Sequence, residues 1–254
     1  MPDLATFDAR PLLEVRGLCR SFGGLRAVHQ VDLDVPAGGI IGLVGPNGAG
    51  KTTCFAMIAG FLAADAGSVV FEGADITGEP PHRTALRGMV RTFQITQPFA
   101  GLSVVQNVMV GAYLRHPARA DAEAHARDVA TRLGLGAFLD RPADSLTVAM
   151  RKRLELARAL ATGPKLLLLD EVMAGLNPAE ILEIVGLVRG IRDQGVSILM
   201  IEHVMQAVMA LAETVHVLNQ GSVIARGTPR EIAADKAVVE AYLGRGAAAR
   251  MARG

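Results

Sequence analysis

The chain has 254 residues, a formal net charge of +1, 50% hydrophobic side chains and 20% charged ones, which fits a globular protein and excludes an intrinsically disordered one. The balanced charge argues against a dedicated nucleic-acid-binding protein, in which basic residues normally predominate. No apolar run approaches the roughly 18 residues that cross a bilayer, and the first residues lack the apolar segment of a signal peptide. Two cysteines without metal-binding spacing, Cys19 and Cys54, are typical of a reducing cytoplasm.

The first third of the chain predicts short strands separated by turns. Residues 40–44 are continuously apolar, as expected for a strand that is buried on both faces of a parallel sheet. A glycine-rich turn follows and leads into a helix over about 51–61. Further strands are predicted over 12–20, 31–35, 68–71 and 89–93.

Residues 95–160 predict a helical block. Ser103 and Gln106 form a capping-box pattern before a helix over 104–114, and segments rich in alanine and arginine predict helices over 120–133 and 150–161. Strands and helices then alternate again. Strands are predicted over 165–169, 196–201, 214–218 and 222–226, and helices over 177–194, over 204–212 and from 228. The chain is therefore expected to be an α/β domain over 12–243 with an inserted helical subdomain, followed by a low-complexity tail over 244–254 that is expected to be disordered.

A phosphate-binding loop follows the apolar strand 40–44. The sequence GPNGAGKT matches the pattern G-x-x-x-x-G-K-[ST] at every fixed position and opens a helix, which is the context this motif requires. Glycines allow the backbone to curl so that its N–H groups point at phosphate, and the helix adds its positive end. Lys51 is expected near the terminal phosphates of ATP, and the Thr52 hydroxyl is expected to bind Mg²⁺. The predicted ATP-binding residues here are Gly45, Pro46, Asn47, Gly48, Ala49, Gly50, Lys51, Thr52 and Thr53.

Two carboxylates end the second apolar strand. Four leucines precede Asp170 and Glu171, and in phosphate-binding-loop proteins an aspartate at such a strand end holds Mg²⁺. Glu171 lies one residue further on, where a carboxylate can polarise the attacking water as a general base.

Three further segments give the chain a resemblance to a known family. These are RTFQ at 91–94, EVMAGLNP at 171–178 and IEH at 201–203. A fourth segment, FGGLRAV at 22–28, helps to identify the branch within that family. Together with the phosphate-binding loop and the helical block, they resemble the nucleotide-binding subunits of ABC transporters, and among these the G-type ATPases of branched-chain amino acid importers. The resemblance covers about 12–243. It implies a core with an antiparallel β subdomain and an inserted helical subdomain.

The resemblance also implies roles for single residues. Phe22 matches the aromatic residue that stacks on adenine, and Gln94 matches the glutamine that contacts Mg²⁺ and the attacking water. His203 matches the switch histidine near the γ-phosphate. Residues 174–177 match the loop that crosses the dimer interface, here called the D-loop. On this basis the expected metal ligands are Thr52, Gln94 and Asp170.

The family's signature, Leu-Ser-x-Gly-Gln, is altered in this chain. The corresponding residues are Leu146, Thr147, Val148, Ala149 and Met150. Thr147 keeps a hydroxyl, whereas Ala149 adds a Cβ where a glycine lets backbone approach phosphate closely. In the family this segment binds the nucleotide of the opposite subunit. Val204 also departs from the aspartate that commonly follows the histidine, and nothing in the sequence explains that change.

The resemblance implies partners and a location. An ATPase of this kind uses ATP and Mg²⁺ and forms a head-to-tail dimer with a companion ATPase. It docks on two membrane permeases at the cytoplasmic face of the inner membrane, works indirectly with a periplasmic binding protein, and has no nucleic-acid partner. Two alternatives remain open. A soluble ABC-type ATPase of DNA repair or translation is disfavoured because the chain lacks heptads and a second ATPase domain. A regulatory, nucleotide-holding subunit with weak hydrolysis is kept open by the altered signature.

Overall fold

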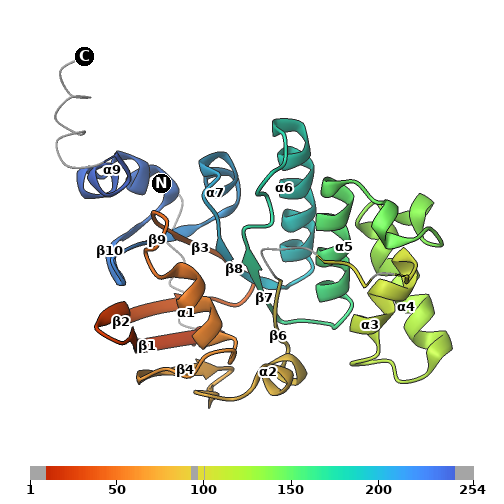
Figure 1. Ribbon diagram of the computed structural model, residues 1–254, viewed down its shortest axis with the longest axis horizontal. Helices are drawn as coiled ribbons and strands as arrows, with labels where there is room; N and C mark the ends of the chain where they lie inside the picture. Colours follow the sequence, from red (N-terminus) through yellow and green to blue (C-terminus); the bar gives the residue numbers. More distant parts are fainter. Residues whose placement is uncertain (1–9, 93–96, 100, 244–254) are drawn as a thin grey trace.

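The computed structural model of the protein describes residues 10–92, 97–99 and 101–243. Its centre is a sheet of six strands in the order β10-β9-β3-β8-β7-β6 (Figure 1). Five of these strands are parallel and β10 runs antiparallel to β9. The strands are β3 (Ile40–Val44), β6 (Met89–Arg91), β7 (Leu166–Asp170), β8 (Ser197–Ile201), β9 (Thr214–Asn219) and β10 (Ser222–Gly227).

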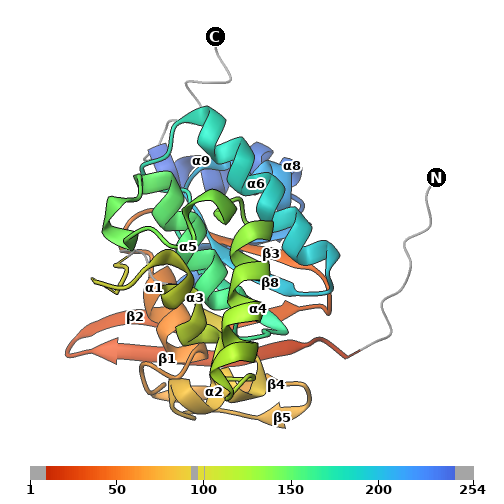
Figure 2. The ribbon, with the colours of Figure 1, turned by 90° about the vertical axis from the view of Figure 1, so that its right-hand side faces the viewer.

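A second, antiparallel sheet has the order β2-β1-β4-β5. Figure 2 shows it along the lower edge of the molecule, below β3 and β8. Its strands are β1 (Leu13–Phe22), β2 (Leu25–Val35), β4 (Ala66–Phe71) and β5 (Ala74–Asp75).

Helices cover the central sheet and form a separate lobe beside it. The lobe contains α3 (Val104–Ala112), α4 (Arg119–Arg132) and α5 (Val148–Leu160), which pack on one another at one end of the molecule (Figure 1). The other helices are α1 (Lys51–Ile58), α2 (Pro81–Arg87), α6 (Pro178–Asp193), α7 (Met205–Leu211), α8 (Pro229–Ala234) and α9 (Lys236–Leu243).

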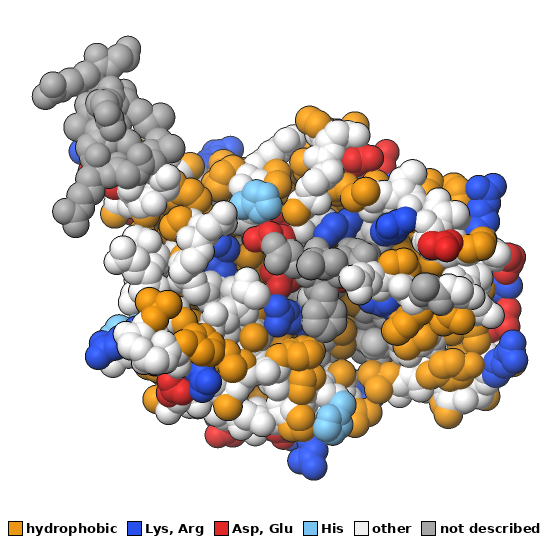
Figure 3. All heavy atoms as spheres, in the orientation of Figure 1, with side chains coloured by type: hydrophobic (Ala, Val, Ile, Leu, Met, Phe, Trp, Pro, Cys, Tyr) orange, Lys and Arg blue, Asp and Glu red, His pale blue; other side chains and the backbone are white. Residues whose placement is uncertain are grey.

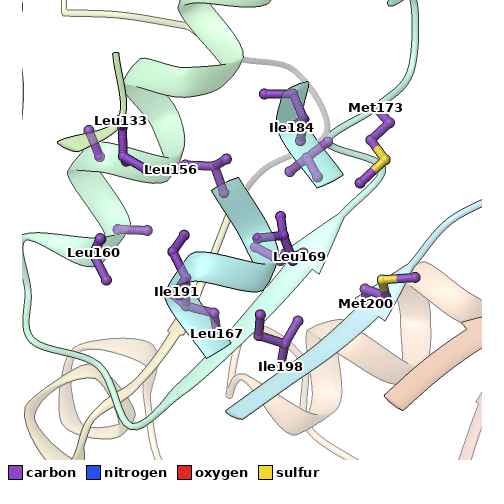
Figure 4. Close-up of a cluster of buried hydrophobic side chains, with 14 of the residues drawn as sticks. Leu133, Leu156, Leu160, Leu167, Leu169, Met173, Ile184, Ile191, Ile198 and Met200 are labelled. Carbon is purple, nitrogen blue, oxygen red and sulfur yellow. The ribbon is translucent and has the colours of Figure 1, made fainter. Parts of the chain in front are cut away.

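Alternate side chains of the central strands enter two different cores. In β7, Leu167 and Leu169 belong to the core beneath the helices, whereas Leu166 and Leu168 belong to the core shared with α1 and the antiparallel sheet. Because successive side chains of a strand point to opposite faces, a continuously apolar strand is what a sheet covered on both faces requires. Figure 4 shows the first core, where Leu167 and Leu169 meet side chains of α5, α6 and β8.

The structure confirms the predicted fold class and most of the predicted elements. The capping box predicted at Ser103 is present at the start of α3, and a second capping box, at Asn177, begins α6. No helix within the described ranges is long and apolar enough to cross a membrane. The tail predicted over 244–254 lies outside the described residues.

Several boundaries were wrong. The strands predicted over 12–20 and 31–35 are the longer β1 and β2, which join directly through a turn at Gly23 and Gly24. Gln30 has φ +47° and the pairing of β1 with β2 shifts register nearby, so the apolar alternation that would have revealed the full β2 is interrupted. The helices α2 and α9 were not predicted.

Candidate nucleotide site

The predicted site residues lie at the ends of three neighbouring strands. β8 pairs with β3 on one side and with β7 on the other, all in parallel. The carboxyl ends of parallel strands share one edge of the sheet, which is where ligands bind in open α/β sheets. The structure therefore brings together the phosphate-binding loop after β3, Asp170 and Glu171 at the end of β7, and His203 after β8.

The phosphate-binding loop needs its glycines for steric reasons. Gly45 has φ +151°, and a Cβ there would lie 2.0 Å from the carbonyl oxygen of Leu218. Gly50 has φ +103°, and a Cβ there would lie 2.2 Å from the carbonyl oxygen of Ala27. Gly50 also occupies the N-cap of α1, where no side chain accepts from the helix amides. The amide groups at this helix start are therefore available to an anion.

Lys51 is folded into the loop. Its side chain is buried, and Nζ donates to the carbonyl oxygens of Gly45 at 2.8 Å and Pro46 at 3.0 Å. Burial lowers the pKa of Lys51, while the negative charges of Glu171 and Asp170 act in the opposite direction. The ammonium group thus stands between the loop and the two carboxylates.

Asp170 offers one oxygen to a cation. Its side chain is 1% exposed, and Oδ2 forms an ion pair with Arg91 at 2.7 Å. Oδ1 is buried and has no hydrogen-bond partner within the described part of the chain. A buried carboxylate oxygen without a donor suits Mg²⁺, which prefers oxygen ligands. The exposed Thr52 lies in the first turn of α1, after β3, and β8 lies between β3 and the strand of Asp170. The third expected ligand, Gln94, lies outside the described residues.

Glu171 and His203 face each other. The carboxylate oxygen Oε2 of Glu171 lies 3.9 Å from Nδ1 of His203. Glu171 has φ +49°, a left-handed conformation that is rare for a residue with a side chain, and its N–H donates to the carbonyl oxygen of Ile201 at 2.9 Å. Such backbone conformations gather at functional sites.

The altered signature begins α5. Thr147 is the N-cap, and its hydroxyl accepts from the N–H of Met150 at 3.3 Å. Val148 is 58% exposed, whereas Leu146 and Ala149 are buried. Thr147 therefore already performs one task of a serine at this position, which is to cap the helix.

Phe22 is 47% exposed at the end of β1, and the guanidinium of Arg20 lies 5.0 Å from its ring centre. An exposed aromatic face at a hairpin tip is compatible with stacking on a base. Cys54, by contrast, is fully buried, and burial raises the pKa of its thiol to about 12, so the helix start does not make it reactive.

Four residues around the site were given no role by the sequence. Arg91 pairs with Asp170, and Glu202 and Lys152 are buried beside Glu171. Tyr242, on α9, lies near the backbone of Gly45, which acts to lower the pKa of its hydroxyl, whereas burial raises it. The segments RTFQ and IEH had drawn attention to Arg91 and Glu202 as part of a pattern, but no sequence signal pointed to Lys152 or Tyr242.

The comparison with known protein families decides what this site belongs to. A model described as "ABC transporter" matches residues 28–174, which is more than half of the chain. The chain belongs to the ABC transporter ATP-binding family. Its core is thus an ATP-binding cassette, and the protein is an ATPase. A second model, described as "Branched-chain amino acid ATP-binding cassette transporter", matches residues 222–248.

Relatives of known name support this assignment along nearly the whole chain. The chain is 39% identical to the high-affinity branched-chain amino acid transport ATP-binding protein BraF of Pseudomonas aeruginosa, over 93% of this chain and 99% of BraF. It is 37% identical to the lipopolysaccharide export system ATP-binding protein LptB of Escherichia coli, over 91% of this chain and 97% of LptB. Among solved structures, the ADP conformation of MJ1267, an ATP-binding cassette of an ABC transporter, superposes with a TM-score of 0.85 at 31% identity, covering 93% of this chain and 100% of that one.

Proposed function

We propose that this ATPase powers the import of branched-chain amino acids or closely related solutes. Support for hydrolysis comes above all from one observation: Lys51, Asp170 and Glu171 meet at the carboxyl edge of the sheet beside an uncapped helix start. Support for the solute class comes from relatives such as BraF and from the second family model at 222–248. That second model favours import over the export that LptB serves.

In this proposal the phosphate-binding loop holds the phosphates of ATP. The amides at the start of α1 and the Lys51 ammonium bind the β- and γ-phosphates, with contributions from the loop residues 45–53. Thr52, Asp170 and Gln94 would hold Mg²⁺, which neutralises phosphate charge when bound. Phe22 stacks on the adenine.

Glu171 and His203 act on the attacking water. The Glu171 carboxylate accepts a proton from the water as its oxygen attacks the γ-phosphorus, and the bond from that phosphorus to the bridging oxygen of ADP breaks. His203, 3.9 Å from the carboxylate, orients it and contacts the γ-phosphate. The products are ADP and inorganic phosphate.

The site is completed by a companion ATPase in a head-to-tail dimer. In such a dimer the nucleotide on this chain's loop meets the partner's signature. This chain's own signature in turn contacts the nucleotide that is bound to the partner. It consists of Leu146, Thr147, Val148, Ala149 and Met150. We expect the D-loop residues 174–177 to lie across the dimer interface.

We infer that two membrane permeases contact an apolar surface between the helical lobe and the core. Five large apolar side chains on this face are between 43% and 52% exposed: Phe61, Leu86, Phe99, Val110 and Tyr113. Two of them, Phe99 and Val110, line a hollow of about 380 Å³ together with residues of α2, α3 and α5. Figure 3 shows hydrophobic side chains on this face over α2 and α3. Exposed apolar groups of this size mark contact surfaces, which supports contact with the permeases. In that arrangement the chain is a peripheral subunit at the cytoplasmic face of the inner membrane. It then works only indirectly with a periplasmic binding protein.

Two variants test the proposed hydrolysis. Lys51→Ala removes a charge-assisted contact worth about 1.5–3 kcal/mol, and ATP binding measured with a fluorescent analogue is expected to weaken by at least about tenfold. Glu171→Gln keeps the phosphate contacts and is expected to bind ATP normally while losing turnover. An unchanged affinity in the first variant or wild-type turnover in the second would refute the assigned roles.

Uptake of radiolabelled leucine by vesicles that carry the assembled transporter tests the solute class.

A further inference from the structure

Two buried charges lie directly behind Glu171. Glu202 follows β8 and is 1% exposed, and Lys152 belongs to α5 and is 5% exposed. Neither is assigned to nucleotide, metal or water in the proposed function. A buried charge is costly unless a partner compensates it, so their presence at this position needs an explanation.

Glu202 joins two loops of the site. Its Oε1 accepts from the N–H of Met173, directly before the D-loop, at 3.0 Å. Its Oε2 is buried without a hydrogen-bond partner among the described residues, and His203 follows Glu202 directly in the chain. Glu202 therefore ties the segment after Glu171 to the end of β8, which leads directly into the histidine that faces Glu171.

Lys152 reaches the same place from the helical lobe. Its Nζ donates to the carbonyl oxygen of Glu171 at 3.4 Å, and its positive charge lowers the pKa of Glu202, which burial and the charge of Glu171 raise to about 7. The ammonium thus contacts the backbone of Glu171 and offsets part of the cost of burying the Glu202 carboxylate.

The backbone of Glu171 requires such support. With φ +49° it occupies a conformation that costs of order 1–3 kcal/mol and persists only where its surroundings hold it. The N–H of Glu171 donates to the carbonyl oxygen of Ile201 at 2.9 Å, and its carbonyl oxygen accepts from Nζ of Lys152 at 3.4 Å. Because the signature residue Thr147 is the N-cap of α5, Lys152 connects that helix to the backbone of Glu171.

We propose that Lys152 and Glu202 are a pair of positioning residues that hold Glu171, the D-loop and His203 in the geometry for hydrolysis. This inference rests on the proposed role of Glu171 as the base. The contacts described for both side chains are with backbone groups next to Glu171, so the pair is expected to contribute little to binding ATP. Its loss is therefore expected to lower kcat and to leave ATP affinity in place.

The experiment compares Lys152→Met, Glu202→Gln and the double variant with wild type in the full chain, assembled with its companion subunits. Turnover is measured at saturating ATP, and the Kd of Mg-ATP is measured separately. Each single variant is expected to lose about tenfold or more in kcat with less than about twofold change in Kd. The double variant is expected to be about as slow as the slower single variant, because the two residues act as one unit.

Conservative and surface variants supply the controls. Lys152→Arg retains the charge and a donor, so it is expected to keep most of the wild-type kcat. Arg153→Met removes a neighbouring cation of α5 whose ion pair with Glu183 lies toward solvent, and it is expected to change neither quantity. If a single variant does not fold, the double variant still decides the matter, because it buries no uncompensated charge.

The proposal is wrong if the double variant retains wild-type kcat, or if kcat and ATP affinity fall in parallel. Failure of the proposed function is seen separately with Glu171→Gln in the same assay. If that variant still turns over, Glu171 is not the base, whatever the behaviour of Lys152 and Glu202.

Discussion

Arg91 and Asp170 form the most deeply buried ion pair that the described residues show. Their side chains are 9% and 1% exposed, and the two atoms in contact lie 2.7 Å apart. Removing one partner of a buried pair leaves the other charge without compensation, which typically costs 3–5 kcal/mol. We therefore expect Arg91→Met to lower the free energy of unfolding by about 3 kcal/mol, as measured by urea denaturation without nucleotide.

Two matched variants interpret that measurement. Arg91→Met combined with Asp170→Asn is expected to recover much of the lost stability, because no uncompensated charge remains buried. Arg87→Met breaks an ion pair with Glu79 on the surface and is expected to leave the denaturation midpoint nearly unchanged. A stable single Arg91 variant would show that water or another group compensates Asp170.

Single residues differed in how far the sequence could predict them. The phosphate-binding loop and the Asp170–Glu171 pair were predictable because their chemistry fixes the spacing along the chain. Arg91 meets Asp170 across 79 positions of sequence, and Lys152 and Tyr242 likewise reach the site from distant elements. Contacts of that kind are created by the packing of strands and helices, and no local pattern encodes them.

Strand β9 carries a histidine with an unusual environment. His216 is 2% exposed, and neither ring nitrogen has a hydrogen-bond partner among the residues that the structure describes. Burial and the nearby charge of Arg226 lower its pKa to about 4.

The depressed pKa of His216 predicts sensitivity to acid. In the unfolded chain His216 has a pKa of about 6.5, so below that pH it binds a proton that the buried ring of the folded chain does not bind. The free energy of unfolding therefore falls as the pH drops toward 4. At about 1.4 kcal/mol per pKa unit, the loss approaches about 3 kcal/mol. His216→Leu is expected to abolish this part of the pH dependence in urea midpoints between pH 7.5 and 4.5.

The pH dependence of stability must be compared between wild type and His216→Leu, because Glu202 changes the stability in the opposite direction as the pH falls. Its pKa is raised to about 7, so the folded state takes up a proton first, and Glu202 adds stability as the pH falls toward its unfolded value. Equal slopes for wild type and His216→Leu would show that His216 is accessible to water.

Elements with chemical start signals were predicted best. α6 begins at Asn177 with a proline at the first helical position and a reciprocal bond from Glu180, and each of these features is legible in the sequence. By contrast, α2 starts after Pro80, which offers no side-chain acceptor. α9 does have a start signal that the prediction missed, because Oδ1 of Asp235 accepts from the N–H groups of Ala237 and Val238. Where the backbone is bulged, as at Gln30, the period-two pattern fails and strand ends cannot be placed.

At the scale of the whole molecule, the altered signature predicts an unequal dimer. The nucleotide-binding half of this chain is intact, whereas Ala149 and Met150 depart from the signature that serves the partner's nucleotide. A homodimer would pair each intact loop with an altered signature. We therefore expect a heterodimer in which the nucleotide on this chain's loop is hydrolysed faster.

Restoring the signature tests that asymmetry. Thr147→Ser, Ala149→Gly and Met150→Gln together are expected to raise the ATPase rate of the homodimer by about tenfold, the equivalent of one contact worth about 1.4 kcal/mol in the transition state. Ala149→Ser serves as a control that adds a hydroxyl and keeps the Cβ. If wild type alone hydrolyses as fast as the restored protein, the altered signature is fully functional and the regulatory alternative loses its support.

The strand order sets when the nucleotide site can first exist during synthesis. β3 leads into the phosphate-binding loop early in the chain, but its two neighbours in the sheet, β8 and β9, begin only at Ser197 and Thr214. A ribosome must therefore deliver most of the polypeptide before β3 is enclosed on both edges. Until then the ATP site is incomplete, so ATP binding cannot stabilise the nascent chain. Its apolar strand segments must meanwhile be protected by chaperones or by rapid completion of translation.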